Sequence, residues 1–189
     1  MKIIFQSRRR NILLAVLSTV LILAATLMAA DKLTPVYRIA CGRDQAVGAF
    51  AKDSMFSGGK VYCCSESGFD TADVPNSVPE SLYRGGRFSE GGNSFLYLLP
   101  NLTPGGQYVL RLHFAEGYYP TGGRVFNVSV NRKPILKDFD IVAAAGAKNR
   151  AMIKQFTVNA DNSGNIRIIF DPVKADPYCS GIELLKVEP

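Results

Sequence analysis

The chain has 189 residues, with 22 basic and 16 acidic side chains and a formal net charge of +6. Residues 1–30 hold four of the basic residues and none of the acidic ones, so residues 31–189 carry 18 basic and 16 acidic side chains, a net charge of +2. A nucleic-acid-binding role therefore loses its main support, and no basic stripe with interleaved aromatics is visible. Residues 31–189 have the size of one domain and show no repeat or linker.

The first 30 residues are predicted to be a targeting segment. A basic flank precedes Ile12–Ala30, which contains no charged residue and is nearly long enough to span a bilayer as a helix. Ala29 and Ala30 permit cleavage, whereas Met28 matches a small-residue cleavage site poorly, so a cleaved signal peptide and an uncleaved single-pass anchor both remain open. In either case the flank stays cytoplasmic and residues 31–189 are exported to the endoplasmic reticulum lumen, cell surface, periplasm or medium. The membrane is then a partner only through this segment.

The exported part is predicted to be almost entirely β-strand. Short segments rich in β-branched and aromatic residues are separated by Gly, Pro, Asn and Asp turn signals. The segments are Val36–Cys41, Phe95–Leu99, Gln107–Ala115, Val125–Asn131, Ile153–Asn159, Ile166–Phe170 and Gly181–Val187.

Alternation within two of these segments predicts buried faces. Side chains two residues apart share a face of a strand. The predicted inward sets are Tyr108, Leu110, Leu112 and Phe114 in one segment and Phe126, Val128 and Val130 in the other, with Gln107, Arg111 and His113 opposite the first set. Regular short strands of this kind favour an all-β fold, a β-sandwich of jelly-roll type. Gly146 makes Ala143–Arg150 more typical of a loop than of a helix.

Four cysteines suggest two disulfides in an oxidising compartment. A vicinal Cys63–Cys64 bond is strained, which favours pairing Cys41 with one of the two and Cys179 with the other. The alternative is that one or more remain buried thiols. No metal site is expected, because a second close cysteine pair and a partnering histidine are both lacking.

Several short motifs follow one another through the exported region. They are Tyr37–Gly42, Asp53 with Ser57–Gly59, Leu82–Arg84, Arg87–Phe88, Tyr108–Glu116, Arg124–Val128, Asp138–Ile141 and Ser180–Glu183. No single motif is specific, but in this order and at this spacing they make the exported region resemble a malectin domain over nearly its whole length. The resemblance implies a β-sandwich module that binds glucose-containing disaccharides, oligosaccharides or glycan ends in a cleft formed by loops. No cofactor is implied.

The family's cleft uses aromatic side chains and an aspartate. Carried over by motif, these positions fall on Tyr118, Tyr119, Phe88 and Asp176, and Tyr62 is the candidate for a further tyrosine, with Phe69 as its alternative. Phe88 stands where the family usually has a tyrosine, and Tyr119 stands where it usually has a phenylalanine. The aromatic stacking platform is therefore kept, while the positions of its hydroxyl groups change. Glu116 and Arg124 are expected to pair across the loop, and Asp138 and Asp140 to accept from nearby backbone amides.

Two other functions are weighed against sugar binding. Malectin-like domains also serve as receptor ectodomains, so this chain is alternatively a module for a glycoprotein or membrane-protein partner, with Tyr118 and Tyr119 as interface anchors. A concave cleft favours a sugar and a flat patch favours a protein. An enzyme is not expected: no nucleophile motif surrounds any serine, His113 is the only histidine, and Glu116 with Asp176 is the one carboxylate pair worth testing.

Two glycosylation sequons are present, Asn101-Leu102-Thr103 and Asn127-Val128-Ser129. Pro104 follows the first and makes it the weaker acceptor. Asn127 is predicted to point outward from its strand, which leaves room for a glycan.

Overall fold

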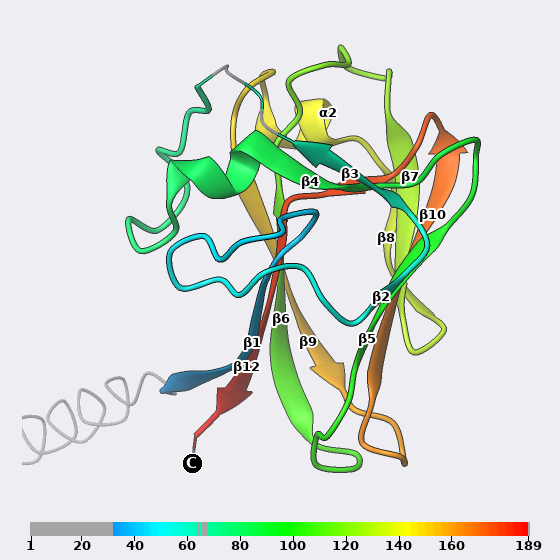
Figure 1. The fold of residues 1–189 in the computed structure, drawn as a ribbon. Coiled ribbons are helices and arrows are strands. Elements are labelled where there is room, and N and C mark those ends of the chain that lie inside the picture. Colours follow the sequence, from blue (N-terminus) through cyan, green and yellow to red (C-terminus); the bar gives the residue numbers. More distant parts are fainter. Residues whose placement is uncertain (1–31, 64, 66–67, 189) are drawn as a thin grey trace, which may run out of the picture. The chain divides into compact units, whose positions relative to one another are not determined.

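Two antiparallel β-sheets pack face to face, and a third, smaller sheet lies at one end of the pair (Figure 1). The computed structural model describes residues 32–63, 65 and 68–188. The helix predicted for residues 1–30 lies outside these residues. Within the described part, no helix is long and apolar enough to cross a bilayer.

The first sheet has the strand order β1-β12-β6-β9, and the second has the order β2-β5-β10-β7-β8. The third sheet has the order β11-β4-β3. The strand bounds are β1 Leu33–Ala40, β2 Phe56–Ser57, β3 Lys60–Cys63, β4 Gly85–Phe88, β5 Phe95–Leu99, β6 Gln107–Phe114, β7 Val125–Val130, β8 Lys133–Phe139, β9 Met152–Asn159, β10 Ile166–Lys174, β11 Tyr178–Cys179 and β12 Gly181–Val187. Two short helices complete the body, η1 at Glu80–Arg84 and α2 at Ile141–Ala145.

The main core lies between the two large sheets. The two predicted inward sets, on β6 and β7, are all buried there, and the predicted alternation is therefore confirmed. Aromatic rings join the layers: Phe114 of β6 contacts Phe126 of β7 with ring centroids 5.9 Å apart and Phe139 of β8 at 5.0 Å. All seven predicted strands are present, and the prediction of an all-β sandwich is correct.

The prediction of a loop at Ala143–Arg150 missed a short helix. Helix α2 begins after Asp140, whose Oδ1 accepts from the amides of Val142 and Ala143 at 2.9 and 3.1 Å. It ends at Gly146, which has a φ of 82° in the left-handed region that glycine adopts without strain. Gly146 thus stops the helix after one turn rather than preventing it, and Asp140 fulfils its predicted role as a backbone acceptor.

A second apolar cluster covers the other face of β6 near its end, where His113 is fully buried. The imidazole lies 2.9 Å (Nδ1) from the Tyr83 hydroxyl and 3.0 Å (Nε2) from Glu183 Oε1, and Arg38 Nε donates to Glu183 Oε2 at 3.0 Å. With Glu183 ionised, a neutral His113 donates to it and accepts from Tyr83, so both imidazole nitrogens and both Glu183 carboxylate oxygens are paired. His113 is therefore a core residue.

This network predicts that acidification destabilises the fold. Burial lowers the pKa of His113 below its ordinary value of 6.5 despite the opposing effect of Glu183, whose own pKa is lowered by His113 and Arg38 against the effect of burial. The unfolded chain then binds the histidine proton more readily, so this contribution to stability is complete above about pH 6.5 and is lost as the pH falls through that value. The Glu183 contribution is lost only below its ordinary pKa of 4.5.

Urea unfolding of wild type and His113→Gln over this range measures the effect. We expect the wild-type free energy of unfolding to decrease between about pH 7 and about pH 5, and the variant, less stable throughout, to show little slope there. Equal slopes for the two proteins would assign the pH dependence to other groups.

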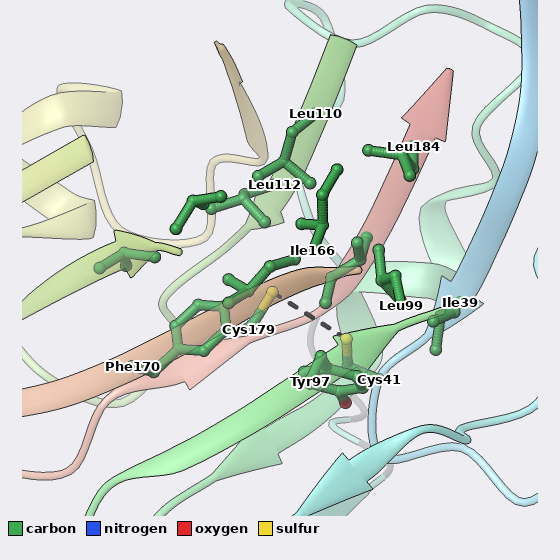
Figure 2. Close-up of a cluster of buried hydrophobic side chains, with 14 of the residues drawn as sticks. Ile39, Cys41, Tyr97, Leu99, Leu110, Leu112, Ile166, Phe170, Cys179 and Leu184 are labelled. Atoms are coloured by element: carbon green, nitrogen blue, oxygen red, sulfur yellow. Dashed lines mark hydrogen bonds between the residues drawn. The ribbon is translucent and has the colours of Figure 1, made fainter. Parts of the chain in front are cut away.

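The predicted pairing of Cys41 and Cys179 with Cys63 and Cys64 is wrong. Cys41 and Cys179 are free, fully buried thiols with their Sγ atoms 4.0 Å apart, in the core among Tyr97, Leu112 and Phe170 (Figure 2). Neither is paired with Cys63 or Cys64, and the alternative of buried thiols holds for both. Cys64 lies outside the described residues. Burial raises the pKa of Cys41, which keeps this thiol protonated.

The sequons differ in their surroundings. Asn101 is exposed in a turn with a φ of 58°. Asn127 is half-buried, and its Oδ1 accepts from the amide of Asp138 at 2.8 Å, where β8 is irregular.

Candidate functional site

A concave cavity of about 330 Å³ opens where the third sheet meets the loop that joins β6 to β7 and the segment that leads into β11. Its walls come from distant parts of the chain, and half of the lining residues are aromatic. The lining residues are Tyr62, Ser65, Phe69, Phe88, Ala115, Glu116, Gly117, Tyr118, Tyr119, Arg124, Asp176 and Tyr178.

All five residues proposed from the sequence line this one cavity. Tyr62 lies on β3, Phe88 on β4, the two tyrosines on the loop after β6, and Asp176 on the segment before β11. Both candidates for the further tyrosine position are present, because Phe69 lines the cavity as well as Tyr62. The structure therefore brings together every residue that the family pattern indicated.

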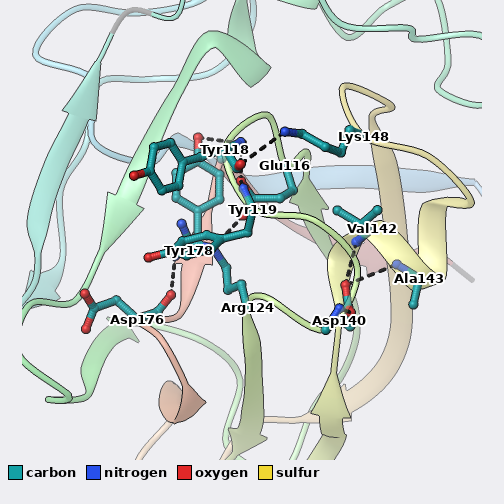
Figure 3. A network of polar contacts seen from close by, with 12 residues as sticks. Glu116, Tyr118, Tyr119, Arg124, Asp140, Val142, Ala143, Lys148, Asp176 and Tyr178 are labelled. Atoms are coloured by element: carbon teal, nitrogen blue, oxygen red, sulfur yellow. Dashed lines mark hydrogen bonds and ion pairs between the residues drawn. The ribbon is translucent and has the colours of Figure 1, made fainter.

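The two adjacent tyrosines form a corner rather than a flat shelf. Their ring centroids are 4.9 Å apart and the rings are inclined by 82°, so each presents a different face (Figure 3). Tyr118 is 76% exposed and Tyr119 is half-buried. An aromatic side chain so exposed on a structured loop leaves its apolar surface available to a ligand.

Glu116 holds the loop that carries these tyrosines. Its carboxylate is nearly buried, and Oε1 accepts from the backbone amides of Tyr118 and Tyr119 at 2.7 and 3.0 Å. Oε2 accepts from Arg124 Nε at 2.5 Å, which confirms the predicted pair across the loop. Asp140 adds a second anchor by accepting from the amide of Gly122. The backbone of the platform is thereby fixed before any ligand arrives.

Arg124 connects the platform to the opposite wall. Its Nη1 donates to the backbone carbonyl of Asp176, and its guanidinium lies 4.8 Å from the centroid of Tyr119 and 5.3 Å from that of Tyr178 (Figure 3). Cation–π contacts of this kind stabilise by about 0.5–2 kcal/mol when partly desolvated. One largely buried cation, with its side chain 11% exposed, thus joins three walls of the cavity.

Tyr178 forms the base of the site. It is 6% exposed, and its ring meets that of Tyr62 edge to face at 6.3 Å. Burial raises its pKa, so the phenol stays protonated and can donate. The ring fits against β4 because position 86 is glycine: a Cβ there would lie 2.5 Å from ring atoms of Tyr178.

Asp176 supplies the acceptor at the rim. It is half-buried, and its Oδ1 accepts from Ser89 Oγ and from the amide of Gly92, both at 3.2 Å. Among the described residues, no hydrogen bond reaches its Oδ2, so this oxygen can serve a ligand. The remaining N–H groups of Arg124 provide donors nearby.

The charged groups at the cavity are Glu116, Asp176 and Arg124. Glu116 and Arg124 neutralise each other, which leaves one carboxylate facing the solvent side. Within the described ranges, no group of three or more His, Cys, Asp or Glu side chains is placed to hold a metal ion. The site is therefore an aromatic cleft with one available acceptor.

A family model for the malectin domain matches residues 35–181, which include all strands except the start of β1 and all but the first residue of β12. The chain belongs to the malectin family. Among curated proteins, this malectin domain is 34% identical over 139 residues to the kinesin-like protein KIN-14R of Arabidopsis thaliana, covering 72% of this chain and 12% of that protein. It is 29% identical over 101 residues to receptor-like protein 4 of the same plant, covering 52% and 16%.

Solved structures share the fold at low sequence identity. The ANXUR1 extracellular domain from Arabidopsis thaliana superposes with a TM-score of 0.73 and 21% identity, covering 83% of this chain and 49% of that one. A structure of the plant peptide RALF23 in complex with FER and LLG2 gives 0.71 and 18%, covering 82% and 49%. The malectin domain described here thus corresponds to about half of each solved chain and a small part of each curated relative.

Sequence reasoning did not assign a role in the cleft to Tyr178 or Arg124. Tyr178 lies two residues after Asp176, in a two-residue strand too short to show alternation. Arg124 was expected to make only a structural pair, and its position over two aromatic rings requires the third sheet to be in place. A search for aromatic residues within a few positions of the aspartate would have found Tyr178.

Proposed function

We propose that this chain is a non-catalytic carbohydrate-binding module whose cleft takes a glucose-containing disaccharide, oligosaccharide or glycan end. The observation that supports the proposal most strongly is the convergence of Tyr62, Phe88, Tyr118, Tyr119 and Asp176 on one concave cavity. The proposed location is extracytoplasmic, in line with the predicted targeting segment and with the solved relatives described as extracellular domains.

The cleft suits a pyranose ring on physical grounds. One face of such a ring is a set of C–H groups, which buries apolar area against Tyr118 or Phe88. Hydroxyl groups at the ring edge need partners, since an unpaired buried polar group costs about 1–3 kcal/mol. Asp176 Oδ2 accepts from hydroxyls, and the tyrosine hydroxyls and Arg124 donate. A shallow site of this type binds at about millimolar to micromolar Kd, roughly −4 to −8 kcal/mol.

Catalysis is disfavoured by the state of the candidate groups. Glycoside hydrolysis needs two carboxyl groups free to reach the bond. Both oxygens of Glu116 are engaged, by two amides and by Arg124, and its side chain is 5% exposed. His113 is fully buried within its network and has no access to the cleft.

A protein or peptide partner is the second candidate, and the comparisons favour it. The structural relatives are ectodomains of receptor kinases, and one was solved with a peptide and a second protein. In this role the exposed Tyr118 would be an anchor inserted into the partner, with the cleft accepting a side chain in return. The concave shape of the site, rather than a flat patch, is what favours the sugar.

A glycan array separates the two. Residues 31–189 would be applied beside a Tyr118→Ala/Tyr119→Ala variant whose folding is checked by its urea unfolding curve. We expect wild type to bind gluco-oligosaccharides and the variant to lose that signal, because the platform provides most of the apolar contact. Absence of signal from folded wild type would remove the sugar proposal for that panel and leave the protein partner.

A further inference from the structure

A second hollow adjoins the aromatic cleft. It has a volume of about 470 Å³ and is lined by Gly91, Gly92, Pro172, Val173, Ala175 and Asp176. Asp176 lines both cavities. The two hollows are therefore neighbours that share the Asp176 side chain.

Asp176 is held from the side of the second hollow. The amide of Gly92, in the turn after β4, donates to its Oδ1, as does Ser89 Oγ. The same carboxylate therefore presents one oxygen anchored next to the second hollow and one available to a ligand. A hydroxylated ligand that passes over Asp176 can donate a hydrogen bond to its Oδ2 while occupying both the aromatic cleft and the second hollow.

The lining of the second hollow indicates what kind of group it accepts. Pro172 and Val173 provide apolar surface, and Val173 is 52% exposed because a register shift in β10 turns it out of the ladder. At Gly91 and Gly92 a Cβ would meet almost nothing, so the turn leaves open space above its backbone. Asp176 is the one ionisable residue in the lining. Such a surface suits a neutral ligand with C–H faces and hydroxyls.

We propose that the second hollow is a further subsite, so that this module binds a neutral gluco-oligosaccharide of more than two residues across Asp176. The proposal rests on the proposed function and specifies its ligand class. The aromatic cleft holds the first sugar units of the oligosaccharide. The sugar units that follow contact Pro172, Val173 and the Gly91–Gly92 turn.

Calorimetric titration with α-1,4- and β-1,3-linked gluco-oligosaccharides of two and five residues tests this. We expect the longer ligand of the accepted linkage to bind wild type about tenfold more tightly, equivalent to about 1.4 kcal/mol. Val173→Arg fills the hollow with a long side chain, and it should remove the tenfold gain while leaving disaccharide affinity unchanged. Val36→Arg is the matched control, since Val36 is 40% exposed and lines neither cavity.

The variants separate the possible failures. A longer oligosaccharide can also bind the aromatic cleft more tightly because it offers more sugar units that can occupy that cleft. An affinity gain of this origin would persist in Val173→Arg, and that result would overturn the subsite. Equal affinity of wild type for both lengths would overturn it as well. Disaccharide binding that is lost in Tyr118→Ala supports the proposed function in either case. If folded wild type binds no oligosaccharide, both proposals fail together.

Discussion

Replacing Asp53 with alanine is expected to destabilise the fold by about 3–5 kcal/mol, the cost of leaving a buried charge without its partner. Arg87 is 3% exposed, and its Nε and Nη2 donate to Asp53 Oδ2 at 2.9 and 2.7 Å. The same carboxylate accepts from the amide of Gly42 at 2.6 Å and from the Tyr97 hydroxyl at 2.8 Å. The substitution therefore strands one cation and two further donors in the interior.

The remaining contacts of Arg87 cannot replace the carboxylate. Its Nη1 donates to the carbonyls of Gly58 and Gly59, and its guanidinium lies 3.3 Å from the Phe56 ring centroid. These groups orient the cation but carry no charge, so its desolvation stays uncompensated.

Urea unfolding measures the loss, with Glu90→Ala as the control. Glu90 pairs with Lys60 at the surface, and both side chains are about 60% exposed. Exposed pairs contribute about 0–1 kcal/mol, so the control should unfold close to wild type. Similar losses for Asp53→Ala and Glu90→Ala would contradict the proposed importance of the buried pair.

The sandwich was predictable because its strands obey one rule. On β6 and β7, alternate side chains face a single large core, so period-two alternation identifies both the element and its buried face. The strands that were missed lack this signal for identifiable reasons. β8 is an edge strand with Pro134, an irregular register and a φ of 47° at Asp138, and β4 begins with two glycines.

Pairings between distant segments were not predictable from the same pattern. His113 was placed on the face opposite the core, yet a second cluster built mainly from the segment 40–83 covers it. The cysteine pairing failed for a related reason, since the strand ladder brings Cys41 beside Ser180 and so beside Cys179. Local alternation contains no information on which loop folds over which strand.

The site was predictable only through the family resemblance. Motif order located its five residues, and their convergence on one cavity then followed from the fold. The polar contacts that fix the cleft depend on loop conformation. For example, Glu116 reaches the amides of Tyr118 and Tyr119 only because the chain turns directly after β6.

Glu116→Gln is expected to weaken ligand binding at the cleft by about 30- to 100-fold, or roughly 2–3 kcal/mol, although the substitution changes neither size nor shape. The carboxylate accepts on both oxygens, from two amides on one side and from Arg124 on the other. A glutamine has one acceptor and one donor group. In either orientation of the glutamine amide, its NH2 group faces a donor, which is either the backbone amides of Tyr118 and Tyr119 or Arg124. The hydrogen bond on that side is lost, so either the tyrosine loop or Arg124 is released.

Two measurements test this expectation, one of them independent of the ligand. Affinity for the bound gluco-oligosaccharide should fall in Glu116→Gln and stay unchanged in Asp44→Asn, a control that removes an exposed charge outside the cavity. Chymotrypsin should cleave after Tyr118 faster in Glu116→Gln than in wild type, because a loop that has lost its anchors opens more often. Weakened affinity with unchanged cleavage would mean that Glu116 contacts the ligand itself. Unchanged affinity and unchanged cleavage would show that Arg124 and Asp140 hold the platform without it.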